Sequence, residues 1–234
     1  MTEATTAKIH WNGGVQAEAI NILKEDGGMI VSPTKVGYII MTSDDKGLER
    51  KFAAKNRKRN KPGVVLCGSV EQVKELAQMT PEIEQMYQQH WDEDILLGCI
   101  LPWQEEAKSK IPNDGTKDLM MDQRETSCFV IKFGTPSENI AKEMWEKYGK
   151  FSFASSANPS GKGNRGLVAG IGDQIENAAD LIIEADDYVA SIQPDNTLDT
   201  RYEQGVMVSM VDEAGKLIPE QNGAVGVKPA PIVI

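Results

Sequence analysis

Residues 152–166, SFASSANPSGKGNRG, combine hydrogen-bonding side chains with very little bulk. Ser, Asn, Pro and Gly all favour turns, so one interpretation is an exposed loop. The other is a ligand cradle, because small residues let a phosphate or carboxylate reach backbone N–H groups. In a cradle, the side chains of Ser156, Asn158 and Ser160 would add further contacts. Both interpretations remain open from this segment alone.

Two other segments carry groups that suit an anionic ligand. Residues 33–38, PTKVGY, place a threonine and a tyrosine around a proline where a β-rich run bends. Residues 55–61, KNRKRNK, hold five basic side chains in seven positions. A guanidinium can bind two phosphate oxygens, whereas a lysine ammonium acts as a movable point charge. Taken singly, these segments are also typical of a turn and of a solvated helix end.

The apolar pattern predicts the elements that position these segments. Helical spacing is found in residues 15–26, 44–56, 69–78, 81–91 and 136–148, and β-rich runs alternate with these segments. Such alternation predicts an α/β fold: a twisted open mixed sheet with flanking helices, and a late hairpin through residues 213–215. In open α/β sheets ligands bind beyond strand ends, where the three segments fall.

The predicted domain organisation is simple. We expect a flexible N-terminus at residues 1–10, one α/β domain at residues 11–224, and an extended tail or edge segment at residues 225–234. Residues 103–125 are charged and contain Pro112 and the turn NDG, which predicts a mobile loop. Whether this loop closes over a substrate stays open, as does the choice for Trp103 between a lid anchor and a packed aromatic.

Composition narrows the class of protein. A formal net charge of −10 disfavours an extended nucleic-acid surface, because phosphate contacts need Lys and Arg. The sequence shows no signal-peptide pattern and no apolar run near the ~20 residues of a membrane span, so we expect a soluble cytoplasmic protein. No metal-ligand spacing is evident: Cys67, Cys99 and Cys128 lie in apolar runs as buried free thiols, and the acidic pairs at 44–45 and 186–187 suit caps or turns.

The order and spacing of three motifs resemble the YrdC-like family, whose best-understood members are threonylcarbamoyl-AMP synthases. The motifs are PTKVGY at 33–38, KNR at 55–57 with Lys61 beyond it, and SANPSG at 156–161. The likeness covers roughly residues 15–224.

The resemblance implies a twisted α/β sheet around a positively charged cavity, and a reaction. L-threonine, bicarbonate and ATP would form L-threonylcarbamoyl-AMP and pyrophosphate, which feed formation of threonylcarbamoyladenosine in tRNA. Mg²⁺ would accompany the nucleotide. The implied catalytic residues are Lys55 and Arg57. The implied ATP-binding residues are Lys55, Arg57, Lys61, Ser156, Asn158, Ser160 and Arg165, and the implied residues of the substrate site are Thr34, Tyr38 and Lys132.

Four positions depart from the family pattern. Lys35 stands where the family has an acidic residue, and Lys132 stands where a family strand carries arginine. Val208 replaces a serine, and Gln221 replaces an arginine expected near the nucleotide. Arg165 could supply a cation in place of the missing arginine.

These departures leave three alternatives open. The first is a paralogue that acts on a different, more acidic amine, matched by the two extra lysines. The second is a nucleotide-binding or RNA-binding protein without synthase activity, although tRNA contact is expected to be indirect or weak. The third is a carbamoyltransferase that contains a YrdC-like domain, which would need further domains. No membrane partner is expected, and the sequence does not settle the oligomeric state.

Overall fold

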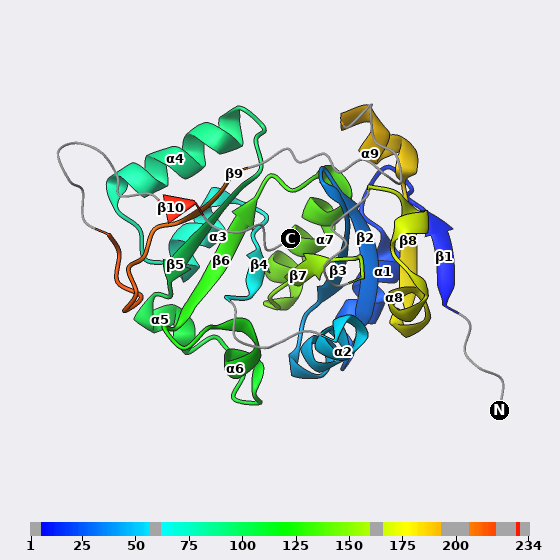
Figure 1. Ribbon diagram of the computed structural model, residues 1–234, viewed down its shortest axis with the longest axis horizontal. Helices are drawn as coiled ribbons and strands as arrows, with labels where there is room; N and C mark the ends of the chain where they lie inside the picture. The colour runs from blue at the N-terminus through cyan, green and yellow to red at the C-terminus, as the bar shows by residue number, and fades with distance from the viewer. Residues whose placement is uncertain (1–5, 57–61, 160–165, 193–205, 219–227, 230–234) are drawn as a thin grey trace.

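The computed structural model describes residues 6–56, 62–159, 166–192, 206–218 and 228–229, which form one large mixed sheet with flanking helices. The predicted fold class is therefore confirmed. The sheet crosses the molecule from β1 and β8 on the right of Figure 1 to β5 and β9 on the left. In spatial order its strands are β1 (Ala7–His10), β8 (Leu181–Glu184), β2 (Met29–Thr34), β3 (Gly37–Thr42), β7 (Phe153–Ser156), β4 (Val64–Leu66), β6 (Thr126–Ile131), β5 (Leu97–Pro102), β9 (Val206–Ser209) and β10 (Lys228–Pro229).

Helices cover both faces of this sheet. On one face α1 and α7 pack together against β2, while α2 packs on β2 and β3 from the other and contacts α8. In the part of the chain that the structure describes, no helix is long and apolar enough to cross a membrane. The helices are α1 (Ala17–Leu23), α2 (Asp45–Lys55), α3 (Val70–Leu76), α4 (Pro81–Asp92), α5 (Glu105–Lys108), α6 (Thr116–Met120), α7 (Thr135–Tyr148), α8 (Asp173–Ala178) and α9 (Asp186–Ile192).

The central strands are buried on both faces, so they read as continuous apolar runs rather than as alternating ones. Successive side chains still separate into two cores, because a strand directs them to opposite faces. In β3, Ile39 and Met41 pack with α1 and α7, whereas Tyr38 and Ile40 pack with α8 and β8. A third core lies under α3 and α4, around the fully buried Trp103.

Two regions differ from the sequence-based predictions. Ala7–His10, expected to be flexible, form β1, which pairs in parallel with β8. The predicted mobile loop at 103–125 contains α5 and α6, which bury Ala107 and Met120. The many charged residues around these short helices hid their apolar positions from the sequence analysis. The last segment, predicted to be an extended tail or an edge segment, agrees with the second alternative at Lys228–Pro229, which pair with β9 at the edge of the sheet.

The prediction of free thiols is confirmed. All three cysteines are buried and unbridged. Burial also raises the pKa of Cys99 to about 12, and the pKa values of the other two thiols rise for the same reason. These groups are packing residues rather than nucleophiles.

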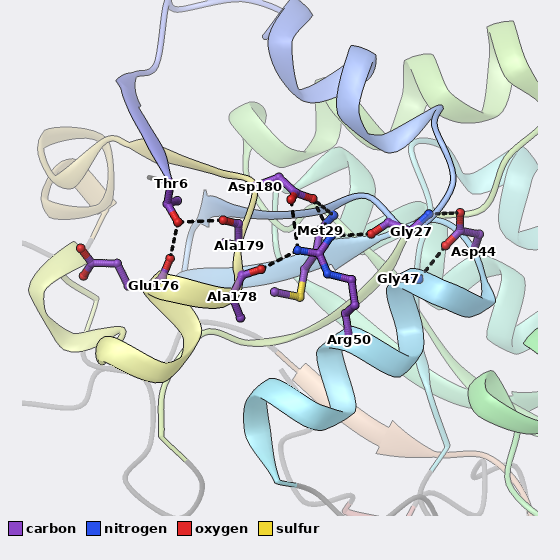
Figure 2. A network of polar contacts seen from close by, with 10 residues as sticks. All are labelled: Thr6, Gly27, Met29, Asp44, Gly47, Arg50, Glu176, Ala178, Ala179 and Asp180. Atoms are coloured by element: carbon purple, nitrogen blue, oxygen red, sulfur yellow. Dashed lines mark hydrogen bonds and ion pairs between the residues drawn. The ribbon is translucent and has the colours of Figure 1, made fainter. Parts of the chain in front are cut away.

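A polar network ties α2 to the start of β2 and to the connection before β8 (Figure 2). The Arg50 guanidinium donates to the Gly27 carbonyl at 2.6 Å, to the Ala178 carbonyl at 2.6 Å and to both carboxylate oxygens of Asp180. Asp180 in turn accepts from the backbone N–H of Met29. At the first turn of α2, Asp44 accepts from the N–H groups of Gly27 and Gly47. Segments more than a hundred residues apart in the chain are thereby held together.

Replacing Arg50 should destabilise the protein because its planar guanidinium group bonds to three residues at once. Arg50→Ala is expected to lower the free energy of unfolding by about 1–3 kcal/mol, which corresponds to about 2–4 °C in Tm per kcal/mol for a chain of this size. Arg50→Lys should recover only part of this loss.

The matched control is Lys46→Ala on the same helix, since Lys46 pairs with Asp26 and both side chains are mostly exposed. Thermal and urea denaturation of the variants measure the difference. Equal stability of Arg50→Ala and Lys46→Ala would contradict the structural role of the network.

Candidate functional site

Lys55 and Ser156, assigned to one site by the sequence, meet in the structure. Lys55 is in the last turn of α2, and Asn56 ends the helix in the left-handed conformation (φ 47°). The Lys55 ammonium donates to the Ser156 carbonyl at 2.5 Å and lies 3.0 Å from the Ser156 hydroxyl. Only 6% of Lys55 is exposed. A buried ammonium of this kind is costly to desolvate, and it attracts anions more strongly than an exposed one.

Asn158 follows Ser156 and is almost fully buried, with 4% of its surface exposed. Its amide nitrogen donates to the Pro159 carbonyl at 3.0 Å, but its Oδ1 accepts no hydrogen bond in the described part of the chain. Buried acceptors are nearly always paired in native proteins. An unpaired oxygen two residues beyond Ser156 is suited to a donor from a bound molecule.

The Pro-Thr motif closes the β2–β3 hairpin. Its two-residue turn is Lys35-Val36, and the Thr34 hydroxyl donates to the Gly37 carbonyl at 2.6 Å and accepts from the Val36 N–H at 3.1 Å. Thr34 is fully buried. Its predicted contact with substrate stays a prediction, and the geometry gives its hydroxyl the role of shaping the turn.

Tyr38 reaches from β3 to the end of β8. Its hydroxyl donates to Asp186 at 2.7 Å and accepts from the Ala185 N–H at 2.8 Å. Burial, followed by the hydrogen bond to Asp186, raises the pKa of Tyr38 well above its ordinary value. The Tyr38 carbonyl also accepts from the N–H of Ala157, so the hairpin directly abuts the SANPSG segment.

A pocket of about 620 Å³ is lined in part by Ala185 and Asp186, the two partners of the Tyr38 hydroxyl. Trp11 and Tyr188 pack edge to face in its wall, with ring centroids 5.4 Å apart. The residues that line it are His10, Trp11, Val168, Glu184, Ala185, Asp186, Asp187 and Tyr188. The acidic pair at 186–187, predicted to be a solvated cap or turn, therefore has a second role, because Asp186 also accepts from the buried Tyr38.

Lys35 and Lys132, the two departures from the family motifs, converge on one carboxylate. The Lys35 ammonium donates to Oδ1 of Asp94 at 2.7 Å and to the Asp94 carbonyl at 2.5 Å. Lys132 lies 3.4 Å from the same Oδ1 and 4.4 Å from the centroid of the Trp91 ring. Burial opposes ionisation of Asp94, but the hydrogen bond from Lys35 and the charges of both lysines outweigh it, so its pKa is lowered.

The start of α7 packs against this cluster. Gly134 has φ 118°, and a Cβ there would lie 2.9 Å from the backbone nitrogen of Lys35. Ser137 donates to the Pro33 carbonyl at 2.7 Å, which fixes the first turn of α7 against the hairpin. Burial raises the pKa of Glu138, although Lys132 and Lys35 act in the opposite direction. The surroundings of Lys132 are thus set by the hairpin, by α7 and by the end of α4.

Arg57, Lys61, Ser160 and Arg165 lie outside the described residues, as does Gln221, so their predicted roles stay predictions. Sequence reasoning missed Asp94 and the partner role of Asp186. The one available signal for Asp94 was its place three residues after the predicted helix at 81–91, where an acidic residue belongs to no motif. Among the described residues, no group of three His, Cys, Asp or Glu side chains could hold a metal ion.

Comparison with known proteins places this arrangement in a family. A family model described as "Sua5_yciO_yrdC: Telomere recombination" matches residues 22–208. A search of curated proteins found no match. The crystal structure of a hypothetical protein, smu.1377c from Streptococcus mutans UA159, is 65% identical with a TM-score of 0.87, and the match covers 98% of this chain and 89% of that one.

Two more distant structures share the fold. P. abyssi Sua5 complexed with L-threonine is 19% identical with a TM-score of 0.62, over 91% of this chain and 56% of that one. E. coli YciO is 18% identical with a TM-score of 0.61, over 95% and 98% of the two chains. With the family model matching most of its length, the chain belongs to the Sua5/YciO/YrdC family.

Proposed function

We propose that this protein is an ATP-dependent carbamoyl-adenylate synthase. The most economical reaction forms L-threonylcarbamoyl-AMP from L-threonine, bicarbonate and ATP, as a cytoplasmic step of tRNA threonylcarbamoyladenosine formation. Amine and bicarbonate give a carbamate with loss of water. A carbamate oxygen then bonds to the α-phosphorus, and the bond from that phosphorus to the β-phosphate bridge breaks to release pyrophosphate.

The observation that carries the proposal is the buried contact of Lys55 with Ser156, two residues before Asn158, whose Oδ1 has no hydrogen-bond partner in the described part of the chain. Phosphoryl transfer of this kind needs little covalent chemistry from the protein and depends on positioning and on neutralising phosphate charge. A buried ammonium is preorganised for that purpose because it needs no reorientation when charge develops. The neighbouring hydroxyl and amide supply the hydrogen-bonding groups that a nucleotide requires.

The acceptor end of the site is supported by the comparison with P. abyssi Sua5, whose structure contains L-threonine. In this chain Lys132 would pair with the carboxylate of the amino acid. Thr34 and Tyr38 would line that end, where their hydrogen bonds keep the hairpin rigid. Mg²⁺ would arrive on the phosphates of ATP and neutralise part of their charge.

Pyrophosphate release tests the proposal directly. The protein is incubated with ATP, Mg²⁺ and bicarbonate and with each of the common amino acids, and mass spectrometry identifies the adenylate. We expect release that requires both bicarbonate and an amine, with L-threonine the best acceptor. RNA binding with a steep salt dependence and no release with any amine would overturn the synthase in favour of an RNA-binding protein.

Lys55→Ala should remove the charge that holds the phosphates. We expect kcat/KM for pyrophosphate release to fall by about 10²-fold or more, with weaker ATP binding in calorimetry. Lys46→Ala is the matched control, because it removes an exposed lysine of the same helix. An unchanged ATP affinity in Lys55→Ala would show that the triphosphate binds elsewhere.

Asn158→Ala separates a ligand contact from a structural one. Because its Oδ1 has no partner in the described chain, the substitution should change the stability of the ligand-free protein by less than about 1 kcal/mol. ATP affinity should fall about tenfold if that oxygen accepts from the nucleotide. Denaturation and calorimetry on the same variant give both values, and unchanged affinity would contradict the assignment.

A further inference from the structure

We infer that Asp94 is a specificity-determining residue of the acceptor site: its carboxylate holds Lys132 and offsets one of two lysine charges, so that the site accepts one acid group and rejects a second. The inference rests on the proposed function. It concerns a residue outside all three sequence motifs, on the turn between α4 and β5.

The contacts of the two lysines are unequal. Lys35 has a side chain only 9% exposed, and it makes two short hydrogen bonds to Asp94, one of them to the backbone carbonyl. Lys132 is more exposed, at 21%, and its ion pair with Asp94 is longer, at 3.4 Å. Lys35 therefore fixes Asp94, and Asp94 places the ammonium of Lys132 over the Trp91 ring. Lys132 is the cation that an acceptor can reach.

The backbone supports the same division of roles. Lys132 has φ 55° and Asp94 has φ 56°, a conformation that residues other than glycine adopt only when their surroundings hold them there. Lys132 is the first residue after β6, and the N–H of Lys35 bonds to the Phe133 carbonyl at 2.9 Å. The two lysines are thus fixed relative to each other by main chain as well as by the shared carboxylate.

Charge then sets what the acceptor may carry. Burial disfavours the ionised form of Glu138, the other carboxyl group beside the lysines. The two ammonium groups and the carboxylate of Asp94 then leave a single net positive charge, which one acceptor carboxylate matches. Asp94 itself is 68% exposed, so a second carboxylate on the acceptor would face it without an intervening shell of protein. Like charges so placed repel, and repulsive groups of this kind commonly set specificity. A monocarboxylic amino acid fits the site and a dicarboxylic one does not.

The test compares acceptors rather than absolute rates. Pyrophosphate release is measured with L-threonine and with L-aspartate for the wild-type protein and for Asp94→Asn, which keeps an oxygen that can accept from Lys35. We expect the ratio of kcat/KM for L-aspartate to that for L-threonine to rise about tenfold or more. Asp94→Glu, which restores the charge, should return the ratio toward the wild-type value.

Asp92→Asn is the matched control, because Asp92 is the last residue of α4, two positions before Asp94, and within the described residues the one side-chain contact found for it is with Gln88. Its ratio should not change. General structural damage lowers both rates together and leaves the ratio constant, so an unchanged ratio in a folded Asp94→Asn protein overturns the inference. Asp94→Ser provides the same comparison if the amide variant does not fold.

A binding measurement separates this inference from the proposed function. Calorimetric titration of L-threonine and L-aspartate, with ATP present, reports acceptor preference without turnover. If the wild-type protein binds amino acids but releases no pyrophosphate, the synthase proposal fails while the preference can still shift in Asp94→Asn, which would support the inference. If the wild-type protein releases pyrophosphate but shows the same acceptor preference as Asp94→Asn by both methods, the inference is overturned. The proposed function then stands.

Discussion

The register of the β2–β3–β7 strands is the constraint on which the site depends. Pro33 pairs with Tyr38 across the hairpin, and Ile39 pairs with Ser156 on the next strand. A slip of one residue in either ladder would turn every side chain to the opposite face. Because both faces of these strands are buried in different cores, such a slip would expose or misplace a whole set of apolar side chains. The packing of the cores therefore fixes where two of the three motifs meet.

Lys55, the first residue of the third motif, is brought to this centre by a helix. Asp44 caps the start of α2, Arg50 anchors its middle to residues near both β2 and β8, and the last turn delivers Lys55 to Ser156. A buried lysine is stable only where oxygen atoms replace the lost water. The carbonyl of Ser156 supplies one, so the position of α2 and the charge of the site are consequences of the same packing.

The sequence predicted what depends on local pattern. The helix at 44–56, its cap and its basic end could be derived from residue types, because capping and periodicity act over a few residues. The order of three motifs predicted that Lys55 and Ser156 share a site, and the structure brings them together. In contrast, the edge strand at Ala7–His10 and the two short helices after Trp103 depend on partners far away in the chain. Neither had a run long enough to be recognised without them.

Lys35 illustrates why motif residues alone do not define the charge of a site. Read from the sequence, two lysines in place of an acid and an arginine suggested a more anionic substrate. In the fold, the carboxylate of Asp94, 59 residues from Lys35 in the chain, contacts both lysines. Electrostatic energy depends on distances in space, and the turn that carries Asp94 has no periodicity or composition that marks it. The net charge of a binding site is thus a property of the assembled structure, and a change within one motif acquires its meaning only from the residue that the fold places opposite it.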